Sequence, residues 1–228
     1  IDGKLDGLII ASPSNPTGTM LGKNELKSLS EYCLDREIRL ISDEIYHGIT
    51  YKERGLSALE FSNDSIVINS FSKYYSMTGW RVGWMVVPED LVRNIECLSQ
   101  NLYISAPTLS QYGALAAFDC KTELDANVER YKKNRTILLS GLHEAGFSKI
   151  APADGAFYIY SDVSDLTNDS EHFCHKILED TGVAITPGVD FDQGRGNAFV
   201  RLSFSGSTQI IREASDRLKD WMSKQGKR

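Results

Sequence analysis

The sequence has no long apolar run and relatively few basic residues. Its apolar stretches, such as residues 8–11 and 86–87, are far shorter than the roughly 20 apolar residues that a membrane-spanning helix needs. Its 25 lysines and arginines are outnumbered by 31 aspartates and glutamates, which gives a formal net charge of −6. Because binding to nucleic-acid phosphates requires a basic surface, this balance argues against nucleic acid as a partner. We therefore expect neither a membrane nor a nucleic acid to be the partner of this chain.

Cysteine is also scarce. The four cysteines lie far apart and form no C-x-x-C pair, which excludes a zinc ribbon and argues against a disulfide framework in a chain of 228 residues. We expect buried free thiols in a reducing compartment, and therefore a cytoplasmic location. We expect no metal site, because the histidine pair at helical spacing, His172 and His175, lacks a third ligand. The cysteines are Cys33, Cys97, Cys120 and Cys174.

The first half of the sequence alternates strand and helix patterns. Short apolar runs bounded by turn residues are typical of buried strands, and residues 23–36 have the apolar spacing of an amphipathic helix. This alternation predicts an α/β fold with a mainly parallel sheet and helices on its faces. The fourth strand begins only nine residues after Lys73, too few for a parallel crossover, so we expect it to be antiparallel to its neighbour. The expected strands are residues 5–11, 39–42, 66–69 and 82–87.

Helix patterns dominate the middle of the sequence, and a mixed pattern follows them. We place a domain boundary inside the helical stretch, which divides the chain into residues 1–122 and residues 123–228. The expected helices are residues 91–100, 108–118 and 127–145, then a helix near 170–180 and a last helix near 208–224. The expected strands of the second part are residues 155–163, 183–186 and 197–204.

Uncommon polar residues follow three of the predicted strands. Taken singly, each has an ordinary interpretation as a turn, a helix cap or a solvated surface residue. Ligands of open α/β sheets, however, bind outside the carboxyl ends of the strands, so the joint placement of these residues predicts a shared site. They are Asn15 after the first strand, Asp43 and Tyr46 after the second, and Ser70, Ser72 and Lys73 after the third.

The residue types at these strand ends suit one kind of ligand. Lys73 could form a Schiff base with an aldehyde, and Asp43, if buried, would need a cationic partner such as a protonated ring nitrogen. Tyr46 and Asn15 could hydrogen-bond a phenolic oxygen. Serine hydroxyls with the nearby Arg81 could bind a phosphate. An aldehyde, a ring nitrogen, a phenolic oxygen and a phosphate together describe pyridoxal 5′-phosphate.

Three segments resemble the signatures of a known family. Residues 15–18 (NPTG), 43–46 (DEIY) and 70–83 (SFSKYYSMTGWRVG) are similar to motifs of the class I/II aminotransferases, the fold-type I pyridoxal-phosphate enzymes. The lysine motif is highly specific, whereas NPTG alone is a weak signal. The resemblance runs in order from about Leu5 to the C-terminus. It implies the later part of a pyridoxal-phosphate-binding large domain over residues 1–122, followed by a smaller α+β domain over residues 123–228.

The resemblance also implies a role for each candidate residue. Lys73 matches the Schiff-base lysine, which moves the proton between the substrate α-carbon and the cofactor, and Asp43 matches the partner of the pyridine nitrogen. With Tyr46, which matches a residue bound to the cofactor O3′, these are the expected catalytic residues. The remaining cofactor contacts are Asn15 at O3′ and Ser70, Ser72 and Arg81 at the phosphate.

Arg201 completes the expected site. It lies in an otherwise apolar run, residues 199–204, and on its own it would be interpreted as an arginine on the solvent face of an edge strand. The run resembles the strand of the family that carries the arginine for the substrate α-carboxylate, a task that suits a planar guanidinium. We expect Arg201 and Asn15 to bind the substrate.

Some features of the family have no counterpart in this sequence. The family segment that supplies backbone amides to the phosphate and an aromatic ring to the cofactor would precede Leu5, and the chain begins at Ile1 without methionine. We therefore expect the chain as given to be an incomplete enzyme. The aspartate-specific branch carries an arginine for the distal carboxylate where residues 101–107 have none, which argues against a dicarboxylate substrate.

The sequence thus predicts an aminotransferase that uses an amino acid and a 2-oxo acid, with a homodimer expected for the full-length protein. Two other functions stay open. A carbon–sulfur β-lyase of the same fold type shares most of these motifs. Some transcription regulators carry an aminotransferase-like effector domain behind a DNA-binding head, which only the residues before Ile1 would reveal.

Overall fold

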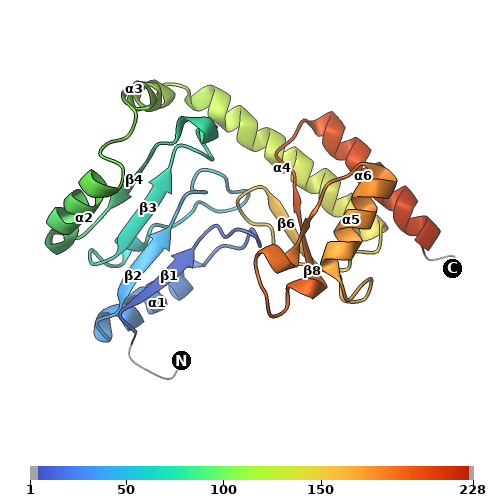
Figure 1. Cartoon of the computed structure of the whole chain (residues 1–228), viewed down its shortest axis with the longest axis horizontal. Helices are drawn as coiled ribbons and strands as arrows, with labels where there is room; N and C mark the ends of the chain where they lie inside the picture. Colours follow the sequence, from blue (N-terminus) through green and yellow to red (C-terminus); the bar gives the residue numbers. More distant parts are fainter. Residues whose placement is uncertain (1–4, 226–228) are drawn as a thin grey trace. The chain divides into compact units, whose positions relative to one another are not determined.

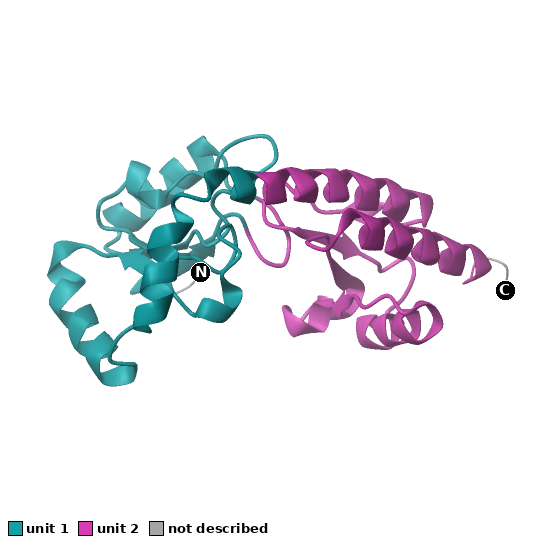
Figure 2. Cartoon of the chain, turned by 90° about the horizontal axis from the view of Figure 1, so that it is seen from above, with its two compact units in different colours: residues 1–13, 20–125 teal, residues 14–19, 126–228 magenta. Residues whose placement is uncertain are grey.

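The structure is a computed structural model that describes residues 5–225 of the chain (Figure 1). The described chain forms two compact units (Figure 2). Unit 1 takes in Met20–Asp125 and the chain up to Pro13, and unit 2 takes in Ser14–Thr19 and the chain from Ala126 onward. A short loop near the start of the chain therefore belongs with the second half of the sequence.

Unit 1 is built on a four-stranded sheet with the strand order β1-β2-β3-β4. The first three strands are parallel and β4 is antiparallel to β3, as the sequence predicts. The parallel register places Ala11 beside Asp43, and Asp43 beside Ile68. The carboxyl ends of β1, β2 and β3 consequently meet at one edge of the sheet. The strands are β1 (Gly7–Ala11), β2 (Arg39–Asp43), β3 (Ile66–Ser70) and β4 (Gly83–Val86).

The helices of unit 1 differ in how deeply they are buried. Helix α1 (Lys23–Asp35) packs Cys33 into a core cluster with Leu40 of β2 and Val67 of β3. Helix α3 (Thr108–Ala117) contributes Ala114 to a second cluster. All side chains of α2 (Glu89–Leu102), in contrast, are at least partly exposed. Among the described helices, none is both long enough and apolar enough to cross a membrane.

Helix α4 (Lys121–Glu144) begins six residues before the start predicted from the sequence, residue 127. The early segment carries one buried apolar side chain, Leu124, so its apolar periodicity is weak. The rest of the helix follows its predicted apolar face, with Leu138 and Leu142 almost completely buried. The division between the two units falls within α4, after Asp125.

Unit 2 contains an antiparallel sheet with the strand order β5-β6-β8-β7. Its fully buried side chains include Ile159 of β6, Val200 of β8, Ile177 of α5 and Leu218 of α6. The strands are β5 (Lys149–Ile150), β6 (Tyr158–Asp162), β7 (Thr186–Pro187) and β8 (Phe199–Ser203). The helices are α5 (Ser170–Thr181) and α6 (Thr208–Gln225).

Unit 2 departs from the sequence prediction in β5, which was not expected, and in two strands that are shorter than expected. The strand expected at residues 155–163 begins only at Tyr158, because Ala156 has a φ of +56°, in the left-handed region that excludes extended backbone. The strand expected at residues 183–186 is reduced to a pair of residues, Thr186–Pro187. It is preceded by Gly182, which ends α5 in a left-handed conformation and starts a loop.

The cysteines are only partly as expected. Cys33 and Cys174 are buried, whereas Cys97 is half-buried and Cys120 is exposed, so the prediction of four buried thiols is wrong for the last two. Cys97 lies on α2, which buries none of its side chains, and Cys120 lies between α3 and α4. The partial exposure of Cys97 and the exposure of Cys120 follow from their places in the fold.

The difference in burial predicts how three of the four thiols react. Burial raises the pKa of the Cys174 thiol to about 12, and it also raises the pKa of Cys33. Since the thiolate is the nucleophile, we expect iodoacetamide to alkylate Cys120 in the native protein at neutral pH, and to reach Cys33 and Cys174 only in urea. Mass spectrometry of the digested protein measures each site separately. Native labelling of Cys174 as fast as that of Cys120 would contradict this assignment.

Candidate functional site

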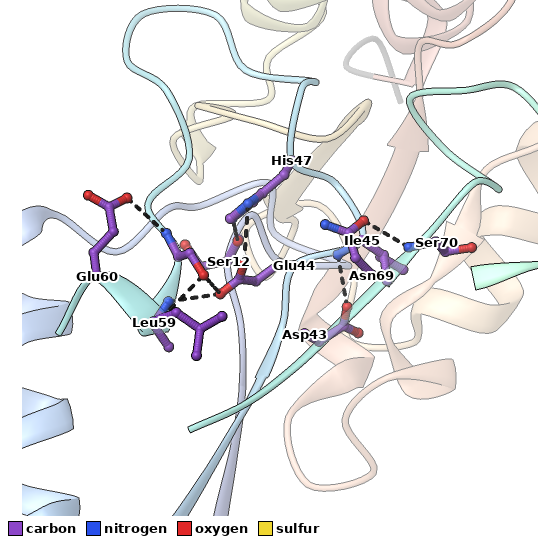
Figure 3. Close-up of polar contacts among 11 residues, drawn as sticks. Ser12, Asp43, Glu44, Ile45, His47, Leu59, Glu60, Asn69 and Ser70 are labelled. Atoms are coloured by element: carbon purple, nitrogen blue, oxygen red, sulfur yellow. Dashed lines mark hydrogen bonds and ion pairs between the residues drawn. The ribbon is translucent and has the colours of Figure 1, made fainter. Parts of the chain in front are cut away.

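Asp43 and Tyr46 are presented by a turn at the carboxyl end of β2. Asp43 is the last residue of the strand, and its Oδ1 accepts a hydrogen bond of 3.1 Å from the backbone of Ile45 (Figure 3). The backbone of Ile49 donates to the carbonyl of Tyr46 at 3.0 Å, and the Tyr46 side chain is buried. Asp43 and Tyr46 are close in the sequence, and the turn holds the carboxylate and the phenol at the same edge of the sheet.

Lys73 lies in the loop that follows β3. Its Nζ is 5.6 Å from the centre of the Tyr46 ring, so the structure brings the lysine to the β2 turn. The loop is anchored on both sides of Lys73 by two buried apolar side chains, Phe71 and Met77, which pack against Ala114 of α3. These contacts hold the backbone of Lys73 in place, and the residue as a whole is half-buried.

The candidate phosphate ligands lie in the same loop. The hydroxyls of Ser70 and Ser72 are 2.9 Å apart, and the backbone of Ser72 donates to Ser70 Oγ at 3.0 Å. Thr78 Oγ1 donates to the carbonyl of Ser72 at 2.7 Å, and Arg81 Nη1 donates to the carbonyl of Thr78 at 2.9 Å. Thr78 therefore links the serine pair to the exposed guanidinium. Hydroxyls and a guanidinium are the donors that a phosphate group requires.

Tyr74 connects the Lys73 loop to two other elements, and sequence reasoning assigned it no role. Its hydroxyl donates to Asp125 Oδ1 at 2.7 Å, and Lys121 also donates to that carboxylate. Its ring lies against Gly48, where the backbone has a φ of +89° and an added Cβ would be 2.7 Å from the ring. A glycine immediately after the β2 turn is the signal in the sequence that could have revealed this close approach.

Asn15 and Arg201 are both part of unit 2 and are bonded to each other. Arg201 Nη1 donates to Asn15 Oδ1 at 2.7 Å, and Nη2 donates to Thr186 Oγ1 at 3.4 Å. The guanidinium carbon is 4.4 Å from the ring centre of Tyr158 and 4.6 Å from that of Phe191. Since β8 lies between β6 and β7, the interpretation of Arg201 as an edge-strand residue is wrong.

The Arg201 side chain has an unsatisfied donor. Its Nε is buried and has no hydrogen-bond partner among the described residues. Because buried donors are nearly always paired, an unpaired guanidinium nitrogen favours a ligand at this position. The arrangement of the aromatic rings and Asn15 fixes the plane of the guanidinium before any ligand arrives.

The loop that carries Asn15 is built into unit 2 by backbone contacts. Ser14 donates to Thr19 at 2.9 Å, and Gly155 donates to the carbonyl of Gly18 at 2.9 Å. Gly18 has a φ of +69°, and an added Cβ would be 3.0 Å from the carbonyl oxygens of Gly155 and Tyr158. Only glycine fits this turn, which explains the NPTG pattern in physical terms.

The sequence and the fold both have close counterparts among known proteins. The model of a family described as aminotransferase class I and II matches residues 2–218. A valine–pyruvate aminotransferase of Mycobacterium tuberculosis is 49% identical over 99% of this chain and 59% of its own length. An aspartate aminotransferase of Bacillus subtilis is 34% identical over 98% of this chain and 59% of its own length.

A solved structure of an aminotransferase from Mycobacterium tuberculosis has a TM-score of 0.95 at 49% identity, and the match covers 98% of this chain and 59% of that one. The chain therefore spans about 60% of the length of the relatives that it matches.

The Tyr74–Asp125 hydrogen bond predicts a change in stability at high pH. Burial and the bond to Asp125 raise the pKa of Tyr74 to about 12, above that of an unfolded tyrosine at about 10. The stabilisation by Tyr74 is thus complete below about pH 10 and is lost as the pH rises to about 12. We expect the difference in unfolding free energy between wild type and Tyr74→Phe, measured with urea, to shrink over this range.

Tyr112→Phe on α3 is the matched control, because Tyr112 is 71% exposed. The difference in unfolding free energy between Tyr112→Phe and wild type should not shrink between pH 10 and pH 12 as that of Tyr74→Phe does. A Tyr74→Phe difference that stays constant up to pH 12 would show that Tyr74 does not make this hydrogen bond in solution.

Proposed function

Because the chain belongs to the class I and II aminotransferases, we propose that the whole protein transfers an amino group between an amino acid and a 2-oxo acid with pyridoxal 5′-phosphate. The observation that carries this proposal is the position of the Lys73 amine 5.6 Å from the Tyr46 ring, at the sheet edge where β2 ends in Asp43. The test is an assay of the whole protein for 2-oxo acid formation with added cofactor.

The chemistry of the donor set in unit 1 fits this cofactor. Lys73 supplies an amine for the aldehyde, Asp43 a carboxylate for the ring nitrogen, and Tyr46 a phenol for O3′. The hydroxyl pair of Ser70 and Ser72 and the guanidinium of Arg81 provide donors for the phosphate. When bound, pyridoxal phosphate supplies an electron-withdrawing ring that stabilises the negative charge left at the substrate α-carbon.

The residues of unit 1 then have distinct tasks. Lys73 would hold the cofactor through Nζ, and the same amine would serve as the general base for the proton on the substrate α-carbon. The same nitrogen later returns the proton as a general acid. The Asp43 carboxylate would keep a proton on the ring nitrogen of the cofactor, and the Tyr46 hydroxyl would donate to its O3′.

In unit 2, Arg201 binds the α-carboxylate of the substrate. A guanidinium offers two parallel N–H donors to a carboxylate, and the Tyr158 and Phe191 rings hold it in one plane. Asn15 accepts from Arg201 through Oδ1, which helps to orient the guanidinium for the substrate α-carboxylate.

We propose an amino acid with an uncharged side chain as the substrate. Support comes from the higher identity to a valine–pyruvate aminotransferase than to aspartate aminotransferases, and from the absence of arginine in residues 101–107. A panel of valine, alanine and aspartate tests this, with aspartate expected to be the poorest of the three. No comparison favours a carbon–sulfur β-lyase or a regulator domain; pyruvate release from a thioether amino acid without an oxo acid would identify the lyase.

The domain assignment, assembly and location of the protein remain proposals. We assign residues 1–122 to the later part of the large domain and residues 123–228 to the small α+β domain. A homodimer of the full-length protein is supported by apolar side chains that α2, α3 and the segment between them expose to solvent. These are Leu98, Leu102, Tyr103, Ile104, Leu109, Tyr112 and Leu115. The cytoplasmic location rests on the free thiols alone.

Replacing Lys73 tests the central role. In the whole protein, Lys73→Ala should lower turnover by at least about 10²–10⁴-fold, because the covalent anchor and the proton carrier are one group. The absorption of cofactor bound as a Schiff base should also disappear, while circular dichroism shows that the fold persists. Lys27→Ala, on the exposed face of α1, is the control and should behave as wild type. Near wild-type turnover of Lys73→Ala would disprove the assignment.

Replacing Arg201 tests the substrate site separately. Arg201→Lys should raise KM by roughly 10–100-fold for every amino acid substrate, because an ammonium cannot reproduce the two parallel hydrogen bonds. Steady-state kinetics over the substrate panel measures this, with Arg195→Lys, 82% exposed at its side chain, as the control. An effect confined to one class of side chain would mean that Arg201 recognises the side chain instead.

A further inference from the structure

Glu44 is a buried acid beside Asp43 that the proposed reaction leaves without a task. Its side chain is 3% exposed, and Oε1 accepts hydrogen bonds from Ser57 Oγ at 3.1 Å and from the backbone of Ala58 at 2.9 Å. Transferring a carboxylate from water into such a place is costly unless donors and a positive charge compensate it. The two donors from the loop before β3 satisfy one oxygen, and the other oxygen, Oε2, faces His47.

His47 lies between two acceptors. Its Nδ1 is 3.4 Å from Glu44 Oε2, and its Nε2 is 3.1 Å from the backbone carbonyl of Ser12 (Figure 3). A carboxylate and a carbonyl only accept hydrogen bonds, whereas a neutral imidazole has a single N–H. A neutral ring would therefore leave one of the two contacts without a proton. A ring protonated on both nitrogens satisfies both contacts and supplies the charge that Glu44 needs.

The surroundings hold the ring in this orientation. An added Cβ at Gly55 would be 2.7 Å from Cδ2 of His47, so the ring lies directly against the backbone there. Ser12 is itself fixed, because its backbone donates to the carbonyl of Asp43 at 3.1 Å and its Oγ accepts from Leu21 at 3.0 Å. The contacts form a closed circuit from Asp43 through Ser12 and His47 back to Glu44.

We propose that Glu44 and His47 are positioning residues: His47 donates from both ring nitrogens, to Glu44 and to Ser12, and thereby holds the turn that presents Asp43 and Tyr46. This inference rests on the proposed function for the roles of Asp43 and Tyr46. The ion pair between His47 and Glu44 also affects the charge that surrounds Asp43. His47 neutralises Glu44, so Asp43 remains the carboxylate of this turn whose charge is available to a cationic ring nitrogen.

Two substitutions can separate the effect of the hydrogen bonds around His47 from the effect of the charges on Glu44 and His47. In Glu44→Gln the amide oxygen can still accept from Ser57 and Ala58, and the NH2 group can donate to Nδ1 of a neutral His47. That histidine can then donate from Nε2 to Ser12. Every contact of the circuit survives without either charge. His47→Phe, in contrast, keeps a ring against Gly55 and removes both donors.

The protonation state is tested first, on the whole protein without cofactor. NMR of protein labelled with ¹⁵N-histidine distinguishes a ring with two N–H groups from a ring with one, and the signal of His47 is identified by its loss in His47→Phe. We expect two N–H groups at neutral pH in the wild type and one in Glu44→Gln. A single N–H in the wild type overturns the ion pair, whatever the protein does with the cofactor.

The positioning role is tested by cofactor titration, followed by absorbance. His47→Phe should raise the dissociation constant of pyridoxal phosphate about 10-fold or more, the effect of losing about 1.4 kcal/mol. It should also change the absorption spectrum of the bound cofactor, because Asp43 and Tyr46 would contact the cofactor ring. Glu44→Gln should remain within about threefold of wild type, since its hydrogen bonds persist.

His175→Phe is the matched control, because His175 forms an exposed contact of 3.4 Å with Glu179 on α5. It should leave affinity and spectrum unchanged. Wild-type affinity and spectrum in His47→Phe would overturn the proposal, as would a Glu44→Gln variant that loses as much affinity as His47→Phe. A wild type that neither binds the cofactor nor transaminates would instead refute the proposed function, and the NMR result would still decide the ion pair.

Discussion

The candidate site of unit 1 depends on the parallel alignment of β1, β2 and β3. Parallel strands end at the same edge of a sheet, and the register places Asp43 beside Ala11 and Ile68. The antiparallel β4 then returns the chain after the Lys73 loop, so that Ser70 pairs with Gly83. Without this alignment, the loop that carries Lys73 and the turn that carries Asp43 and Tyr46 would lie apart. These residues could then not form one site.

Rigid support from the surroundings is the second requirement. The Lys73 loop is held by the buried side chains of Phe71 and Met77, and the acidic turn is held by Glu44 and His47. The two segments also fit each other, because the absence of a Cβ at Gly48 leaves room for the Tyr74 ring. Functional groups placed on such interlocked loops keep their geometry without help from the ligand.

Much of this arrangement could be predicted from the sequence, because it is encoded locally. Apolar runs followed by turn residues predict β1 to β3, and the chemistry of Lys73 and Asp43 at strand ends predicts the site. Glu44 and His47 could not be recognised in the same way, since an acid and a histidine in a turn are usually solvated. Their burial comes from Ser12 and the Ser57–Ala58 segment, which are distant in sequence. The start of α4 was misplaced because Leu124 alone gives no periodicity.

The Asn15–Arg201 hydrogen bond joins positions separated by 186 residues. Synthesis proceeds from the N-terminus at about 5–20 residues per second, so the Asn15 loop emerges many seconds before β8 exists. Ser14–Thr19 belongs to unit 2, whose strands are all encoded much later. The loop must consequently remain without its unit 2 partners until β8 has been synthesised. Closure of this contact is thus a highly non-local step that cannot precede the synthesis of β8.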